Sequence, residues 1–569
     1  MERNVDYVIA DYMSAPDRFR TLRNHTFDVI VIGAGTGGLT AAALLARRGK
    51  RVLVLDQHTV PGGNATTFSR PGYTFDVGLH YLGGCHPNGL IPRILRAAGA
   101  DPVFFEEMDP DGYDILLFPD LEFRVPKGIE AFRERLRNAF PGERRGIDRY
   151  CSLLRSLERL VHESANPAKT LWNLLRSPLL LRWANRSFAD FLQSSTRDVR
   201  LRALLAGQHG NYALPPSRAS LLIGAGVAEH YLEGAYYPRG GGQILSDCLA
   251  ASIEAVDGNI LLRSRAQEIL VRNGRAVGVR FQNPYLGVQE VGARYVLSNA
   301  DVKETLLRLI PEGVLPSRTR ERARRWEMAP ALFVAYLGVR RAALENRQTR
   351  SNYWIHSTYD HEAQYRQAAR GEFPEAPSVF VSIASLKDPR NDSLAPAGIV
   401  NLQLMAVAPS RPEAWGVSAE AESGSRYRSS ALYRERKEAF GRRVIELTRR
   451  AFPCLPEEIV YQEFSSPLTH SRYTLSTGGT GYGIAASPGQ FLFGRPGSRT
   501  KLPGLLLCGA SCRTGHGIAG AMMSGLMAAA AILGPRLMLE VLGKANSVGR
   551  CIPDIATVPP RVYDSERTG

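Results

Sequence analysis

Apolar and polar positions near the start of the chain follow in blocks that predict a strand, a helix and a second strand. A β-branched run, Val29 to Ile32, predicts a buried parallel strand. After it come three glycines at GxGxxG spacing, Gly33, Gly35 and Gly38, and then an alanine- and leucine-rich stretch typical of a packed helix. Val52 to Leu55 predict the second strand, which ends at Asp56. The pattern therefore predicts one βαβ unit over residues 27–56.

The three glycines and the acid at the end of this unit predict a dinucleotide site. Gly33 would allow the tight turn, Gly35 the close approach of a pyrophosphate, and Gly38 the close packing of helix on strand. Asp56 follows Gly33 by 23 residues, near the offset of an acid that binds the adenosine ribose, and an acid there argues against a 2′-phosphate. The alternative is an ordinary βαβ unit that binds nothing.

A second glycine turn favours a flavin over a nicotinamide cofactor. Gly62 and Gly63 follow the acidic strand closely, and the segment TFDVGLHYLGG comes after them. Such a turn can bring backbone toward the pyrophosphate and ribityl chain of an extended FAD. The alternative for these two glycines is a plain surface turn.

Three later segments also carry secondary-structure signals. Residues 260–279 predict strands joined at Asn273–Gly274, a strong hairpin signal, and residues 293–301 predict a further strand. Near the end, a strand, a loop from Gly509 to His516 and a helix from about Gly517 are expected. The apolar stretch Ile518 to Gly534 has 17 residues, fewer than the roughly 20 that span a bilayer, so it predicts a buried helix.

The order of these segments predicts an α/β protein in which a Rossmann-type FAD-binding domain is interleaved with a mixed α+β substrate domain. With 569 residues, 44% of them hydrophobic, the chain can build a large core. A family resemblance, given below with the segments that carry it, implies that flavin-binding segments lie at both ends and in the middle. The predicted bounds are an N-terminal arm at 1–26, an FAD-binding domain at 27–105, 236–305 and 495–540, a substrate domain at 106–235 and 306–494, and a flexible tail at 541–569.

Cysteine usage and the N-terminus bear on compartment and metal content. Seven cysteines without CxxC spacing do not predict a disulfide framework, and we expect a reducing, cytoplasmic setting. Cys508 and Cys512 are expected to be buried apolar cysteines, with a covalent flavin link as the alternative. The sequence shows no zinc, haem or iron–sulfur ligand pattern, and no metal is expected. The first 26 residues lack the features of a signal peptide.

A net charge of +16 requires an anionic partner to be considered. No nucleic-acid fold signature is present, so nucleic acid is not expected. Arg155 to Arg186 mixes leucines, Trp172 and Trp183 with basic residues, a composition that suits an anionic membrane surface. We therefore expect peripheral attachment to the cytoplasmic side of a membrane. The alternative is a basic helical face packed on the substrate domain.

Five segments together resemble the phytoene desaturase, carotenoid isomerase and retinol saturase group of FAD proteins, and most of all the retinol saturases: VLVLDQHTVPGG, FDVGLHYLGG, NYALPPSRAS, HYLEGAYYPRGG and GTGYGIAASPGQF. The resemblance covers residues 27 to about 534. It implies an amine-oxidase-like flavoprotein fold and an apolar polyene substrate. It also implies that the Ala266 backbone meets the adenine, and that Gly509, Gly517 and Ala521 complete the cofactor site.

The reaction follows less directly from the sequence. Flavin N5 can take or give a hydride, so such a protein could saturate, isomerise or desaturate a C=C bond. Saturation or isomerisation of a carotenoid or retinoid-like polyene is favoured, although the final loop, CGASCRTGHGIAGA, departs from the saturase pattern. The alternatives are a desaturase that uses quinone or oxygen, and a non-catalytic prenyl-binding escort protein of the same fold. The electron donor or acceptor stays unidentified.

Few residues could move a proton beside the flavin. The candidates are His516 in the final loop, His80 and Tyr81 in the flavin-proximal segment, and Tyr231 before YYPRGG. His516 is favoured. The alternative for His516 is a hydrogen bond that merely shapes the loop, and for His80 and Tyr81 it is packing against the flavin ring.

Overall fold

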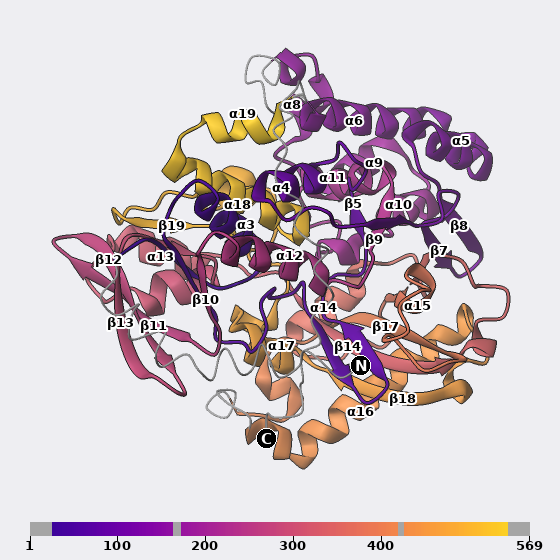
Figure 1. Cartoon of the computed structure of the whole chain (residues 1–569). Helices are drawn as coiled ribbons and strands as arrows, with labels where there is room; N and C mark the ends of the chain where they lie inside the picture. The colour runs from indigo at the N-terminus through magenta and orange to yellow at the C-terminus, as the bar shows by residue number, and fades with distance from the viewer. Residues whose placement is uncertain (1–25, 163–171, 419–425, 544–569) are drawn as a thin grey trace.

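The computed structural model describes residues 26–162, 172–418 and 426–543. Two seven-stranded sheets organise this part of the chain, with helices between and around them (Figure 1). The predicted arm up to residue 25 and the predicted tail from residue 544 lie outside the described residues, as do residues 163–171 of the basic segment.

The first sheet begins with the predicted βαβ unit. Strand β1 (Phe27–Ile32) is followed by helix α3 (Thr36–Ala46) and strand β2 (Val52–Leu55), which confirms the three predicted elements. The strand order is β10-β2-β1-β13-β12-β11, with β19 pairing β13. The other strands are β10 (Asn259–Leu261), β11 (Arg265–Arg272), β12 (Arg275–Asn283), β13 (Gly287–Ser298) and β19 (Leu505–Leu507).

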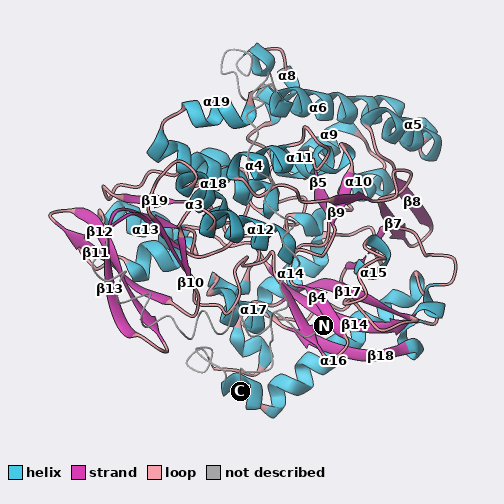
Figure 2. Cartoon of the chain, viewed as in Figure 1, coloured by secondary structure: helices cyan, strands magenta, loops and turns pink. Residues whose placement is uncertain are grey.

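Strand β13 joins two kinds of pairing in this sheet. Its residues 293–298 pair in parallel with β1, and its residues 287–292 pair antiparallel with β12. The hairpin between β11 and β12 turns at Asn273 and Gly274, both at positive φ, as the Asn–Gly signal predicted. A parallel sheet of apolar strands thus carries an antiparallel extension at one side, which lies on the left in Figure 2.

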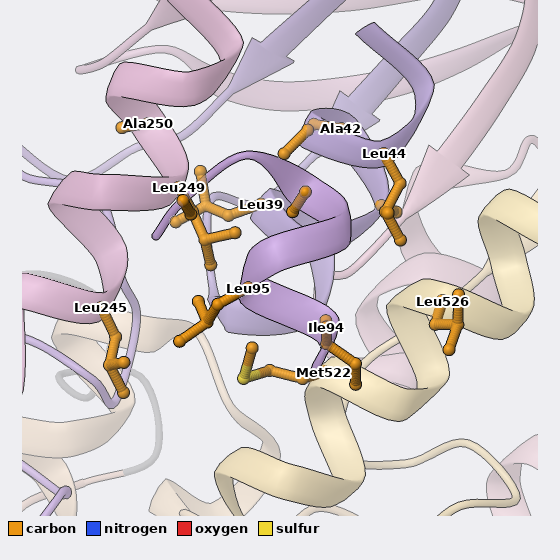
Figure 3. Close-up of a cluster of buried hydrophobic side chains, with 14 of the residues drawn as sticks. Leu39, Ala42, Leu44, Ile94, Leu95, Leu245, Leu249, Ala250, Met522 and Leu526 are labelled. Atoms are coloured by element: carbon orange, nitrogen blue, oxygen red, sulfur yellow. The ribbon is translucent and has the colours of Figure 1, made fainter. Parts of the chain in front are cut away.

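Four helices cover the parallel part of the first sheet. Figure 3 shows leucine, isoleucine and methionine side chains of α3, α4 (Leu90–Ala98), α12 (Gln243–Glu254) and α18 (Gly517–Leu533) meeting in one buried cluster. Helices α3 and α18 approach closely, because a Cβ at Gly525 would lie 2.2 Å from the Gly37 carbonyl oxygen. The apolar stretch after His516 is therefore a buried helix, as predicted. Helix α19 (Arg536–Leu542) follows it.

The second sheet has the order β18-β14-β17-β16-β15-β7-β8 and is antiparallel except between β15 and β7. Its strands are β7 (Asp114–Phe118), β8 (Leu121–Val125), β14 (Ala331–Arg340), β15 (Asn352–Ile355), β16 (Val379–Ile383), β17 (Ile399–Ala408) and β18 (Ile459–Ser465). Helix α16 (Ala431–Leu447) packs on one face of this sheet through buried aromatic side chains.

A helical layer covers the other side of the second sheet, at the top right in Figure 1. It contains α5 (Ile129–Ala139), α6 (Arg144–His162), α8 (Pro178–Trp183), α9 (Phe188–Ser195), α10 (Val199–Leu205) and α11 (Leu221–Leu232). The strands of the first sheet come from residues 27–55, 259–298 and 505–507, and those of the second from 114–125 and 331–465. The division into domains stays a prediction. None of the helices in the described ranges combines the length and apolar character needed to cross a bilayer.

Candidate cofactor and substrate site

The first glycine turn leaves no room for side chains. Gly33 has φ +97°, a conformation that favours glycine, and Gly35 is the N-cap of α3. A Cβ on Gly35 would lie 2.7 Å from Asn299 Nδ2, and one on Gly38 would lie 2.2 Å from the Gly33 carbonyl oxygen. Helix α3 can therefore begin directly against β1, which leaves its first backbone N–H groups next to the turn.

The second glycine turn lies against the first. The Gly62 N–H donates to the Ala34 carbonyl over 2.7 Å, and Gly35 and Gly62 form a parallel bridge. A Cβ on Gly63 would lie 3.2 Å from Gly35 Cα, and both Gly62 and Gly63 have positive φ. Two turns that are separate in the sequence thus form one continuous backbone surface. We call this surface, formed by Gly33, Gly35, Gly38, Gly62 and Gly63, the glycine surface.

Asp56 lies at the edge of this surface. Its carboxylate accepts hydrogen bonds of 2.7 Å from the backbone N–H groups of Ala34 and His58. Burial raises the pKa of Asp56, and these hydrogen bonds oppose the rise. A carboxylate has about four lone-pair sites, so two stay open for ribose hydroxyls. Ala266 lies nearby in β11, because the Ser264 N–H donates to the Asp56 carbonyl over 2.6 Å.

The final loop closes the same region from the other side. A Cβ on Gly509, at φ +97°, would lie 2.7 Å from Asn299 Oδ1, and Asn299 Nδ2 donates to the Gly33 carbonyl over 3.3 Å. The Ala521 carbonyl oxygen lies 2.9 Å from where a Cβ on Gly37 would be. Gly517, the first residue of α18, has φ +77° and no atom of the described residues within 4 Å of an added Cβ, so the space before this helix is open.

These features fit an FAD. Helices α3 and α18 both begin without a capping side chain or an acidic residue in the first turn, within the part of the chain that the structure describes. Free N–H groups and the positive end of the helix dipole would attract a phosphate or another electron-rich group there. The glycine turns supply backbone that can approach such a group closely, and Asp56 offers open acceptor positions beside them.

A cavity of about 300 Å³ lies next to the start of α18. It brings together all four predicted proton-moving residues: His80, Tyr81, Tyr231 and His516. Most of its other walls are apolar or aromatic and come from α11 and from strands of the second sheet, among them Ile223, Leu332, Trp354, Phe380, Met405 and Val407. Tyr81 and Tyr231 stack with ring centroids 4.0 Å apart. The cavity can therefore enclose an apolar molecule against a wall that carries hydroxyl and imidazole groups.

A chain of hydrogen bonds crosses one wall of the cavity. His516 Nε2 donates to the Asn211 carbonyl over 3.2 Å, and Asn211 Nδ2 donates to the Tyr81 hydroxyl over 2.7 Å. The Tyr81 hydroxyl donates to Asp114 Oδ2 over 3.0 Å. Gln208, Asn352 and Trp354 also donate to the Asp114 carboxylate, which is completely buried. These donors fix the Asp114 carboxylate, and Asp114 together with Asn211 holds the Tyr81 hydroxyl in one position.

Two of the histidines that line the cavity, His516 and His80, are neutral at physiological pH. Burial lowers the pKa of His516 to about 3, with Arg495 adding to the effect, and burial together with Lys387 lowers the pKa of His80 to about 3. Burial raises the pKa of Tyr81 well above its usual value, so its hydroxyl keeps its proton. His516 Nδ1 is buried and has no hydrogen-bond partner among the described residues.

Sequence reasoning did not identify three polar residues around this cavity. Asp114 lies in an ordinary apolar strand, so no local signal marks it. Asn211 opens the segment NYALPPSRAS, which carried part of the resemblance and was a usable signal. Lys387 is 1% exposed and donates to the His80 carbonyl over 2.7 Å; burial lowers its pKa to about 7 against the pull of Asp76 and Asp114.

Known proteins resemble this chain over most of its length. It is 27% identical to an all-trans-retinol 13,14-reductase of Danio rerio, with 92% of this chain and 88% of that protein covered. It is 28% identical to a chloroplastic prolycopene isomerase 1 of an Oncidium hybrid cultivar, with 91% and 86% covered. The solved cyclohexylamine oxidase of Brevibacterium oxydans shares the fold, with a TM-score of 0.57, 17% identity and coverage of 89% and 99%.

Two family descriptions match parts of the chain. Residues 31–98 match the NAD(P)-binding Rossmann-like domain, which contains both glycine turns and Asp56. Residues 424–533 match the flavin containing amine oxidoreductases, and this range includes the final loop and α18. The fold, the glycine surface and these similarities lead to one conclusion. The chain has an amine-oxidase-like flavoprotein fold and is similar, over most of its length, to FAD-dependent oxidoreductases that include a retinol 13,14-reductase and a prolycopene isomerase.

Proposed function

We propose that the protein is an FAD-dependent oxidoreductase that saturates or isomerises a C=C bond of an apolar, carotenoid or retinoid-like polyene. The observation that carries the proposal is the cavity at the start of α18, whose apolar walls meet Tyr81, Tyr231, His80 and His516. The printed activities of the two relatives, retinol 13,14-reduction and prolycopene isomerisation, support the same substrate class.

In this proposal the glycine surface holds FAD. The backbone of Gly33, Gly35 and Gly38 meets the pyrophosphate, Asp56 accepts from the ribose hydroxyls, and Ala266 offers its backbone to the adenine. The remaining contacts come from Gly62, Gly63, Gly509, Gly517 and Ala521. Bound FAD supplies hydride transfer at flavin N5.

The chain's own part in the reaction is to hold the polyene, exclude water and place a proton. Tyr81 is the proposed proton donor, because its hydroxyl keeps its proton at neutral pH. Its O–H must turn from Asp114 toward the cavity, and the hydrogen bond from Asn211 Nδ2 offsets part of the cost that burial and Asp114 add to a phenolate. His516 positions Asn211 through its Nε2–H and offers Nδ1 as an acceptor. Tyr231 fixes the Tyr81 ring by stacking, and His80 packs beside Lys387.

Two other functions are less well supported. A desaturase would need quinone or oxygen as acceptor, and the described residues offer no feature that selects either; the electron partner of this protein stays open. A non-catalytic escort protein would need no hydroxyl or imidazole groups in the cavity. Both relatives are named for reactions on a retinoid or a carotenoid.

Attachment to an anionic membrane surface on the cytoplasmic side is part of the proposal. Trp172, Leu175 and Leu181 are 59%, 60% and 53% exposed, and Arg176 lies over the Trp172 ring with 5.6 Å between Cζ and the centroid. Exposed apolar side chains beside arginines suit the interface of an anionic bilayer. A polyene dissolved in lipid could then reach the enzyme without crossing water.

Anaerobic incubation of the reduced and the oxidised enzyme with a panel of polyenes tests the reaction, read by absorbance and mass. A gain of two hydrogens with reduced flavin identifies a saturase, and unchanged mass with a shifted spectrum identifies an isomerase. A loss of two hydrogens with oxidised flavin would identify the desaturase instead. Turnover of amines but of no polyene would overturn the substrate class.

A further inference from the structure

Three histidines from separate segments meet in the interior, at the wall of the cavity. His209 opens the short helix His209–Asn211, His356 follows β15, and His361 precedes α14 (Glu362–Arg370). All three are buried, at 1%, 1% and 4% exposure, and their nearest ring nitrogens lie within 4.8 Å of one another. No other histidine, cysteine or acid of the described residues joins them.

Hydrogen bonds to the outer ring nitrogens orient the three imidazoles. His361 Nε2 donates to the Ala203 carbonyl over 2.9 Å, which leaves His361 Nδ1 with its lone pair. His356 Nδ1 lies 2.8 Å from Ser378 Oγ, and His209 Nδ1 lies 2.7 Å from the Tyr365 hydroxyl. Outer partners of this kind, a backbone carbonyl and hydroxyls, are the ones that orient histidines bound to metal ions.

One ring nitrogen of the cluster, His361 Nδ1, is buried without a hydrogen bond to any described residue, and His356 Nε2 has only the backbone of Gly207 beside it. Leaving a buried acceptor unpaired costs about 1–3 kcal/mol. His209 Nε2 makes only long contacts, of 3.3 Å to the same Ser378 Oγ and 3.5 Å to Gln364 Nε2.

We propose that His209, His356 and His361 bind one divalent transition metal ion of the zinc class. Three imidazoles with one open position are a common donor set for such an ion. With zinc–nitrogen bonds of about 2.0–2.1 Å the three nitrogens would lie about 3.4 Å apart, so the rings move together by roughly 1 Å on binding. A fourth ligand can come from the cavity side, because His209, Gln364 and Ser378 line the cavity.

Such an ion would add a direct link between three segments that hydrogen bonds and packing already join. His209, His356 and His361 belong to the helical layer, the second sheet and α14, and a bound ion links all three at the cavity wall. We therefore expect metal binding to raise the midpoint of thermal unfolding, because the ion binds the folded state. The expected effect is independent of FAD and of the reaction.

The test uses the untagged, flavin-loaded protein, dialysed against EDTA and then titrated with Zn²⁺ or Co²⁺. We expect about one ion per chain by elemental analysis, a raised unfolding midpoint, and visible absorption bands of tetrahedral Co²⁺. Fewer than about one ion per ten chains after titration at micromolar metal would overturn the proposal and leave a buried water as the occupant.

Variants locate the ion. His356→Gln and His361→Gln should each lower metal content at least tenfold while the flavin absorbance per chain is kept. His86→Gln, at a partly exposed histidine outside the cluster, is the matched control and should keep the metal. Metal content equal to wild type in His361→Gln would place the ion elsewhere and contradict the site. If a variant fails to fold, the NMR spectrum of the Co²⁺-loaded wild type decides instead, because histidines bound to Co²⁺ give characteristic paramagnetic shifts.

Discussion

The glycine surface and the cavity, which lie side by side at the start of α18, are built by different means. The glycine surface is backbone: it exists because Gly33, Gly35, Gly38 and Gly63 carry no side chain. The cavity is built from side chains of distant segments, held by hydrogen bonds such as those of Asp114. The first tolerates no added atom, whereas the second can lose an atom and keep its shape. Their responses to substitution should therefore differ in kind.

The largest effect is expected at the glycine surface. Gly38→Ala places a Cβ 2.2 Å from the Gly33 carbonyl oxygen, so α3 must move away from β1. We expect the flavin content of the purified variant, read by visible absorbance per chain, to fall at least tenfold. Gly49→Ala is the control in the same unit: its φ of +75° costs about 1–2 kcal/mol, yet nothing lies within 4 Å of the new Cβ. Equal flavin content in both variants would contradict the difference between the regions.

The cavity should respond in turnover rather than in flavin content. Tyr81→Phe removes the proposed proton donor and leaves Asn211 Nδ2 without its acceptor, so we expect kcat on a polyene to fall about 100-fold. Tyr231→Phe keeps the stacked ring and should lower kcat less than about tenfold. Single-turnover kinetics on the reduced enzyme measure both. A larger loss in Tyr231→Phe would assign the donor to the other ring.

A third prediction concerns pH. We expect the helices around the cavity to contribute more to the pH dependence of stability than the glycine surface does. Glu229 in α11 is 4% exposed, and burial, with Glu233 and Glu158 adding to it, raises its pKa to about 8. Because the folded state holds this proton more tightly than the unfolded state, the free energy of unfolding should fall as pH rises from about 4.5 to 8. The expected fall is on the order of 2–4 kcal/mol.

Glu229→Gln should remove this part of the pH dependence, as measured by denaturant unfolding at pH 5 and pH 8. The amide has no proton to lose in this range, so the variant should be the more stable protein, relative to wild type, at the higher pH. Glu312→Gln, at an exposed position, is the control and should leave the difference between the two pH values unchanged. The same slope in Glu229→Gln and wild type would exclude Glu229 as the source.

The smallest effect is expected at the surface. Trp172 is 59% exposed, so Trp172→Ser should lower binding to anionic vesicles several-fold and leave flavin content and turnover in detergent unchanged. Trp183 packs edge-on against Phe191 with centroids 5.7 Å apart, so Trp183→Ser should instead lower the unfolding midpoint. Vesicle sedimentation at low and high salt measures the binding, which salt should weaken. Equal binding of wild type to neutral and anionic vesicles at low salt would rule out the electrostatic part.

The same contrast explains what sequence could predict. The strand, helix and strand of residues 27–56 were predictable because glycine turns and β-branched runs act locally, and the Asn273–Gly274 hairpin follows the same logic. The roles assigned to individual cofactor and cavity residues stay predictions. Asp114 could not be found, because its function as an acceptor exists only once Gln208, Asn352 and Trp354 have been brought to it by the fold.

The histidine cluster shows a second limit of prediction from the sequence. His356 and His361 lie five residues apart, a spacing within the range of paired metal ligands, and this was the one local signal available. The third member, His209, is 147 residues away from His356 and meets it only because the helical layer packs on the second sheet. Neutral buried histidines look the same in a sequence as exposed ones.

The position of Asn299 between Gly33 and Gly509 has a consequence for the order of biosynthesis. The first glycine turn is made within the first tenth of the chain, but β19, which pairs with β13, and α18, which packs on α3 (Figure 1), come from residues 505–533. A nascent chain that stops short of these residues has an open sheet edge beside β13 and lacks α18 over α3. We therefore expect the flavin to bind only after residues 505–533 have been synthesised. Until then the side of α3 that α18 covers stays exposed.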